Sequence, residues 1–333
     1  MDESRLARKH FSRIGWFFVI AIAVIYGVQY LEKLVAEAFV PGWRDRMDVV
    51  LLLSIIPMYL FGFPVLIALM KRFVPAVKLR RYRMSPGQYL VALITCLGLA
   101  YTSNFVGTFL GFVISLVTKK PMTNAAQELT SQMSPGMILF YVVLLAPIME
   151  EFIFRKLIVD RTVRYGQGIA ILLSGLMFGL FHGNLNQFCY TVVIGFFLGF
   201  LYLKTGNIKI TISLHMIFNF FGGMLPSLLL KNVDLQNFLE LSAEGMSDAA
   251  ILEQLNVNQG VILIMCLFGL GVLLLAVTGS ILCIVFACTG KFRLKHFEGE
   301  LPAGKRFSAV FCNTGMLVFI GFWLAQIVMG LFV

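Results

Sequence analysis

Few ionisable side chains fall inside the long apolar runs of this 333-residue chain, and they gather in one third of it. Glu150, Glu151 and Arg155 follow fourteen apolar or small residues that begin at Gly136. Because Glu151 and Arg155 are four residues apart, a helix brings them onto one face as an ion pair. Glu150 points about 100° away and has no basic residue at that spacing, so its carboxylate can serve as a general base. The alternative is a helix end that emerges at the cytosolic interface.

Two of the four histidines lie in apolar runs. His182 closes one run, and His215 shares a helix face with Asn219, four residues further on. His10 and His296 lie in basic segments, where we expect them to be solvated. A single buried histidine is more often a packing residue than a ligand. Two of them beside a carboxylate pair and an asparagine favour a functional site instead.

Glu150, His182, His215 and Asn219 together supply what peptide-bond hydrolysis requires. Neutral imidazoles and a carboxylate can hold zinc, so His182, His215 and Glu150 are candidate metal ligands. Without a metal, Glu150 and His182 can activate a water molecule, and Asn219 can donate to an oxyanion. The spacing of these residues leaves both mechanisms open.

The elements that must position these residues are membrane-spanning helices. The chain is 59% hydrophobic and 13% charged, with a mean hydropathy of +0.87, which excludes a compact water-soluble fold, a disordered chain and a disulfide scaffold. We predict an all-α, polytopic membrane protein with about nine transmembrane helices. The predicted spans are 14–31, 49–70, 88–117, 136–158, 168–182, 187–203, 208–230, 260–289 and 308–333. The fifth span is short, Pro64 and Pro147 are expected to kink their helices, and glycines four apart, such as Gly175 and Gly179, permit close helix contact.

The basic residues predict the orientation of these helices. With a cytoplasmic N-terminus, the inner segments hold 21 lysines and arginines and the outer segments hold 6. The net charge of +10 is therefore assigned to topology and to anionic lipid, not to nucleic acid. No cleavage site of small residues follows the first run, so we expect a retained first helix in a multi-pass cell-membrane protein. Two acidic-basic clusters, 32–48 and 291–306, are predicted to be solvated loops, with partner sites as the alternative.

The predicted spans divide the chain into four regions. They are an N-terminal membrane region of three helices (1–130), a core of four helices that carries the polar residues (136–230), an external acidic segment with a short amphipathic helix (231–259), and a C-terminal membrane region of two helices (260–333).

The polar residues also fall into three ordered motifs, EExxxR, FxxxH and HxxxN, the second of which begins at Phe178. In this respect residues 136–225 resemble the CAAX-protease and bacteriocin-processing (Abi) family, whose eukaryotic relatives are the type II CAAX prenyl endopeptidases. The resemblance implies core helices around a cavity that opens toward membrane and cytosol. It further implies that Glu150 and His182 activate water, and that His215 and Asn219 stabilise the oxyanion or help to hold a metal. Glu151 and Arg155 would support the site.

The favoured hypothesis is an intramembrane endopeptidase that acts on a membrane-associated, prenylated or otherwise lipidated peptide or protein. The resemblance also allows a non-catalytic membrane scaffold or a bacteriocin-immunity protein of the same fold. A transporter is a third hypothesis, but such proteins often contain internal repeats, and we detect none here. The sequence does not define an oligomeric state.

Overall fold

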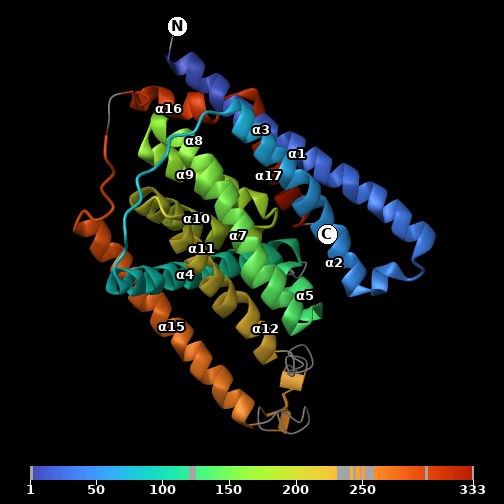
Figure 1. Cartoon of the computed structure of the whole chain (residues 1–333). Helices are drawn as coiled ribbons and strands as arrows, with labels where there is room; N and C mark the ends of the chain where they lie inside the picture. Colours follow the sequence, from blue (N-terminus) through green and yellow to red (C-terminus); the bar gives the residue numbers. More distant parts are fainter. Residues whose placement is uncertain are drawn as a thin grey trace. The chain divides into compact units, whose positions relative to one another are not determined.

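The computed structural model describes residues 3–119, 125–230, 241–242, 245–247, 250–251, 259–296 and 299–331. Every regular element within these residues is a helix (Figure 1), which confirms the predicted all-α class. The external helix predicted within 231–259 lies largely outside the described residues.

Seven helices in the described part of the chain are long and apolar enough to cross a membrane. They are α1 (Glu3–Phe39), the run from α2 to α3 (Met47–Phe73), α4 (Pro86–Thr118), the run Pro135–Tyr165, α10 (Leu185–Thr205), the run Ile208–Leu229 that contains α11, and α15, which crosses within Gly260–Cys288. An eighth span forms if α16 (Ala303–Val310) and α17 (Thr314–Met329), which are bent by 65° at the break between them, are counted together. The chain is therefore a multi-pass membrane protein.

Shorter or subdivided elements complete the fold. They are a 3₁₀ turn at Trp43–Asp45, α2 (Met47–Ile56), α3 (Phe63–Phe73), α5 (Ala125–Gln132), α6 (Pro135–Met137), α7 (Ala146–Glu150), α8 (Asp160–Thr162), a 3₁₀ turn at Val163–Tyr165, α9 (Gln167–Phe181), α11 (Ile208–Asn219) and α12 (Leu225–Leu230), with α15 as a whole covering Gln259–Cys288.

The difference from the predicted nine spans arises at two places. Helix α9, the predicted fifth span, has 15 residues and is about 22 Å long, which is shorter than a hydrocarbon core of about 30 Å. The predicted last span is interrupted because Asn313 caps a new helix, its Oδ1 accepting the N–H of Met316 at 3.0 Å. Length and composition predict apolar runs well, but a cap inside such a run is a local feature that hydropathy averages out.

Four segments have π-helical geometry, in which each carbonyl accepts the N–H of the residue five positions ahead. These segments are Pro57–Gly62, Ile138–Leu145, Glu151–Val159 and Phe220–Met224. The first two immediately precede the turns that contain Pro64 and Pro147, where a missing N–H and the bulk of the ring disturb a regular helix. The prolines expected to kink their helices are thus accompanied by a widened turn. Such widened turns are frequent at functional sites.

The chain forms two compact units, each assembled from separate segments. Unit 1 contains residues 1–82, 150–208 and 293–333, and unit 2 contains residues 83–149 and 209–292. The four sequential regions described above are a division by motif and remain a prediction.

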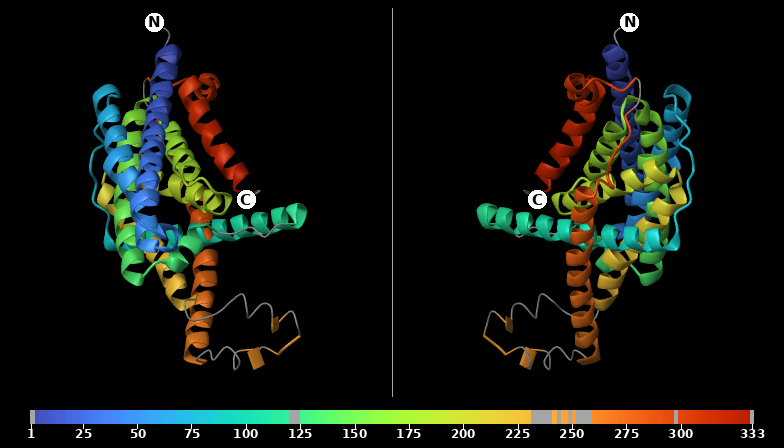
Figure 2. Two further views of the ribbon diagram at one scale, coloured as in Figure 1. Left: turned by 90° about the vertical axis from the view of Figure 1, so that its right-hand side faces the viewer. Right: turned by 90° about the vertical axis from the view of Figure 1, so that its left-hand side faces the viewer.

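Glycines bring helices together in unit 1. A Cβ on Gly195 of α10 would lie only 2.7 Å from the Cα of Gly175 on α9, so these helices touch through their backbones, as the small residues predict. At the two ends of the chain, Gly15 of α1 meets the backbone of Gly315 at the start of α17. Figure 2 shows the N-terminal helix running beside the C-terminal helices.

In unit 2, glycines likewise let two helices touch through their backbones where α4 crosses α15, a crossing that Figure 2 shows. A Cβ on Gly279 would lie 2.7 Å from the Cα of Gly98. Next to this crossing the hydroxyls of Thr102 and Ser280 are 2.9 Å apart. The hydroxyl pair and the glycines hold the two longest helices of this unit in register.

Candidate active site

The predicted ion pair between Glu151 and Arg155 is present in unit 1. Arg155 Nε lies 3.1 Å from Glu151 Oε2, and both side chains are fully buried. They lie in the π-helical segment Glu151–Val159, which begins directly after Glu150. A buried charge is costly without a close partner, so this pair fixes the helix at the point where Glu150 projects from it.

Arg155 also ties this helix to α9. Its Nη1 donates to Ser174 Oγ at 3.1 Å, and Ser174 Oγ donates to the carbonyl of Phe154 at 2.7 Å. The guanidinium lies over the ring of Phe178, 4.9 Å from its centre. Arginine over an aromatic face is a favourable contact, and more so where water is excluded.

Phe178 connects Arg155 with His182. The rings of Phe178 and His182 meet edge to face, with their centres 4.9 Å apart. The FxxxH spacing therefore has a physical reason that the sequence alone does not reveal. One aromatic ring supports the buried arginine of the first motif and orients the histidine of the second.

The backbone of α9 determines the tautomer of His182. Nδ1 of His182 lies 2.9 Å from the carbonyl oxygen of Phe178. A carbonyl only accepts, so Nδ1 carries the hydrogen, and Nε2 is the acceptor of the neutral ring. Gly183 then turns the chain at a φ of +67°, and Asn184 caps α10 by accepting the N–H of Gln187 at 2.8 Å.

Glu150 is partly exposed and lies near two tyrosines of unit 1. Its carboxylate is close enough to the hydroxyls of Tyr59 and Tyr190 to act on both electrostatically. The Tyr190 hydroxyl also accepts a hydrogen bond of 3.1 Å from Gln187 Nε2. The sequence argument missed both tyrosines because it considered only carboxylates, basic side chains and amides. Their signal is a hydroxyl at positions 59 and 190 within otherwise apolar runs.

The other two predicted site residues belong to unit 2. His215 is buried on α11, with 3% of its surface exposed, and its ring centre lies 6.1 Å from that of Phe218. Asn219 Nδ2 donates to the carbonyl of Val142 at 2.8 Å. Their meeting with Glu150 and His182, which the motifs predict, remains a prediction.

The hydrogen bond from Asn219 to Val142 is explained by the helix that carries Val142. In the π-helical segment Ile138–Leu145, Ala146 donates its N–H to the carbonyl of Tyr141, five residues back. The next residue in that register is Pro147, which has no N–H to offer to Val142. Asn219 therefore satisfies a carbonyl that the proline leaves without its helical donor.

A shared metal ion requires several ligand side chains to lie close together. Within the described residues, no three His, Cys, Asp or Glu side chains are grouped so that they could share one ion. The bond from Nδ1 of His182 to Phe178 would make Nε2 the nitrogen that binds zinc, but the predicted set of His182, His215 and Glu150 extends over both units. Zinc binding stays a prediction.

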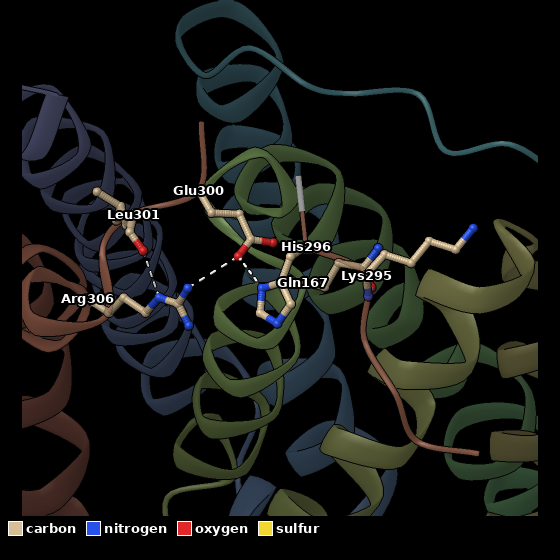
Figure 3. Close-up of polar contacts among 6 residues, drawn as sticks. All are labelled: Gln167, Lys295, His296, Glu300, Leu301 and Arg306. Atoms are coloured by element: carbon tan, nitrogen blue, oxygen red, sulfur yellow. Dashed lines mark hydrogen bonds and ion pairs between the residues drawn. The ribbon is translucent and has the colours of Figure 1, made fainter. Parts of the chain in front are cut away.

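One expectation about the basic segments is wrong, and a second holds for only part of its segment. His10 is 8% exposed, because α1 extends back to Glu3 and buries that residue, whose Nε2 donates to the carbonyl of Arg161 at 2.9 Å. The cluster 291–306 is not a solvated loop throughout. In Figure 3, Glu300 accepts from His296 Nδ1 at 3.0 Å and from Arg306 Nη2 at 3.2 Å. Glu300 is 10% exposed, whereas His296 itself is 81% exposed, as predicted.

The similarity of this chain to known proteins is found in the segment that carries the three motifs. Residues 132–221 match the family described as type II CAAX prenyl endopeptidase Rce1-like, and this range contains every predicted site residue. A protein of Bacillus subtilis (strain 168) named "Putative membrane peptidase YdiL" is 27% identical over 150 residues, which is 44% of this chain and 57% of that protein. The chain thus spans little more than half the length of this relative. No solved structure matches. The resemblance to the CAAX-protease family is confirmed.

Proposed function

Because its motif-bearing segment matches the CAAX endopeptidases, we propose that this chain is an intramembrane endopeptidase. Its substrate would be a membrane-associated peptide or protein, including one that carries a prenyl or other lipid group. Three features support the proposal: the family match over residues 132–221, the name of the bacterial relative, and the multi-pass membrane fold.

The observation that carries the proposal is the connection between the first two motifs. Arg155 bonds to Ser174 and lies over Phe178, and Phe178 contacts His182. The helix that carries the candidate base is thereby fastened to the helix that carries the candidate histidine. A buried arginine with this set of partners costs stability to assemble and is more easily explained as a support for chemistry than as membrane packing.

In the proposed reaction, Glu150 takes a proton from a water molecule while Nε2 of His182 accepts a hydrogen bond from it. The water oxygen attacks the carbonyl carbon of the peptide, and the electron pair of the C=O bond moves to its oxygen. The tautomer of His182 suits this role, because Nδ1 already donates to Phe178. The hydroxyls of Tyr59 and Tyr190 lie near enough to the Glu150 carboxylate to interact with it electrostatically.

His215 and Asn219 would stabilise the oxyanion by hydrogen bonding. The amide of Asn219 has two N–H bonds, and the bond to Val142 uses one of them. The second is the one that the oxyanion would require. When the tetrahedral intermediate collapses, the C–N bond breaks and the proton held by Glu150 passes to the leaving nitrogen. A zinc ion, if His182, His215 and Glu150 held one, would polarise the scissile carbonyl.

The test is cleavage by the purified full chain in detergent micelles, with a farnesylated fluorogenic peptide that ends in a C-a-a-X sequence as the probe. Replacement of Glu150 by alanine is expected to lower the rate by about 10²–10⁴-fold, the usual contribution of a general base. Glu37→Ala, which changes an exposed carboxylate, should leave the rate unchanged.

Cleavage that survives in Glu150→Ala contradicts the role given to Glu150. A folded wild-type chain that cleaves neither this probe nor an unprenylated peptide of the same sequence contradicts the proposed activity and favours the scaffold hypothesis.

A further inference from the structure

We infer that a pocket of unit 1, outside the candidate active site, binds the phosphate group of an anionic phospholipid. The pocket has a volume of about 380 Å³, within the range of small-molecule sites. It lies between the end of α3, the extended segment after it, and the last turns of the helix Pro135–Tyr165. Its charged and aromatic lining consists of Lys71, Lys78, Phe152, Lys156, Asp160 and Arg161.

The single carboxylate of this pocket is already occupied. Asp160 Oδ2 receives the ammonium of Lys156 at 2.6 Å, and Oδ1 receives the hydroxyl of Tyr202 at 2.8 Å. The same ammonium donates to Tyr202 at 3.2 Å. Asp160 and Lys156 therefore cancel each other, and the remaining lining is cationic.

Three cations of the pocket form no ion pair with a carboxylate among the described residues, although Asp160 acts on the adjacent Arg161 electrostatically. Lys71 and Lys78 are exposed and form no ion pair there, and Lys71 Nζ lies 5.7 Å from the ring centre of Phe152. Arg161 is only 6% exposed, and backbone carbonyls fix its orientation. Its Nε donates to Met70 and its Nη1 to Leu157, at 3.1 and 3.3 Å. Three positive groups from three segments thus surround one space, which suits a phosphate.

The backbone holds this arrangement in place. The N–H of Val77 donates to the carbonyl of Asp160 at 2.6 Å, which fastens the extended segment that carries Lys78 to the last turns of the helix that carries Arg161. The pocket is therefore a feature of the fold and not a chance proximity of two flexible lysines.

Apolar lining and position favour a phospholipid over a free phosphate. Ala76, Val77, Phe152 and Leu157 also line the pocket, so its walls suit the glycerol and upper acyl region of a lipid. Two candidate membrane spans, Met47–Phe73 and Pro135–Tyr165, end beside it. The ends of such spans lie at the depth of the lipid headgroups.

The test uses the full chain purified in a neutral detergent. Binding of short-chain phosphatidylglycerol is measured by native mass spectrometry, with phosphatidylcholine and inorganic phosphate as the other probes. We expect one saturable phosphatidylglycerol site that is weakened at least about tenfold in the double variant Lys71→Glu, Lys78→Glu, since each basic residue near an anionic lipid contributes about fivefold or more. The matched control is Arg80→Glu with Arg83→Glu, which makes the same charge change at exposed residues that do not line the pocket, and it should bind within about twofold of wild type.

Equal weakening in both double variants would show general attraction between charges and overturn the site. So would equal binding of phosphatidylglycerol and phosphatidylcholine. Inorganic phosphate that displaces the lipid at similar concentrations would show that the occupant is a soluble anion and not a lipid. If the glutamate variant misfolds, Lys71→Gln with Lys78→Gln serves instead, with binding of phosphatidylglycerol still expected to weaken at least about tenfold.

Discussion

The region that carries Glu150 and His182 is fastened by buried side chains, whereas the region that carries His215 and Asn219 is fastened through a backbone carbonyl. In the first region, Arg155 pairs with Glu151 and lies over Phe178. In the second, Asn219 donates to Val142, whose helical donor is missing at Pro147.

This difference shows two ways to hold a polar residue inside an apolar helix bundle. A buried ion pair is rigid, but it exposes the fold to large losses if one partner is removed. An amide that satisfies a carbonyl in a widened turn is a weaker link, and its loss costs about one hydrogen bond. Under the proposed mechanism, the first kind suits the residues assigned to water activation, and the second suits the residues assigned to the oxyanion.

The largest effect is expected for Arg155→Met. The Glu151 carboxylate would lose its cation in a buried site, and the free energy of unfolding should fall by about 3–5 kcal/mol. Unfolding of the purified chain in detergent measures this loss.

The exposed pair of Arg44 and Glu37 is the matched control, because Arg44→Met removes the same kind of partner at the surface and should change stability little. The double variant Arg155→Met, Glu151→Gln should recover much of the loss. Equal effects at the buried and exposed pairs would mean that the Glu151 pair does not fasten the first region.

An intermediate effect is expected for Phe178→Leu. Leucine keeps an apolar side chain but removes the ring beneath Arg155 and beside His182, so the free energy of unfolding should fall by about 2 kcal/mol. Proteolytic activity should fall as well, because His182 loses the ring that orients it.

Phe181→Leu on the same helix is the control. Phe181 packs on Phe154 and Trp323, so this change should lower stability while sparing activity. An activity loss of the same size in both variants would contradict an orienting role for Phe178.

The sequence predicted those parts of the site that depend on one helix. The spacing of Glu151 and Arg155 predicted their ion pair, and hydropathy predicted the long spans. It could not supply a reason for Phe178, because the partners of that ring include Arg155 and Phe154 on another helix. The sequence wrongly predicted that His10 is solvated. No helix-breaking residue stands between Glu3 and the first apolar run, so α1 begins earlier than hydropathy indicates.

The parts that could not be predicted depend on backbone register and on contacts distant in the sequence. Pro147 is visible in the sequence, but the carbonyl that lacks a donor is identified only when the turn is known to be π-helical. The placement of Tyr59 and Tyr190 near Glu150 likewise requires three helices to be assembled.

The smallest effect, and the sharpest test of the second region, is expected for Asn219→Ala. Loss of the donor to Val142 should lower the free energy of unfolding by about 1 kcal/mol. Pro147→Ala restores an N–H that Val142 can use, so Asn219→Ala should cost less in that background, with a coupling of about 0.5–1 kcal/mol in a double-mutant cycle measured by unfolding in detergent. Leu144→Ala, an exposed change in the same segment, should show no coupling with Asn219. If the changes in the free energy of unfolding at positions 147 and 219 were strictly additive, the amide of Asn219 would not replace the missing donor. The contrast between a region held by side chains and a region held through a backbone carbonyl would then be wrong.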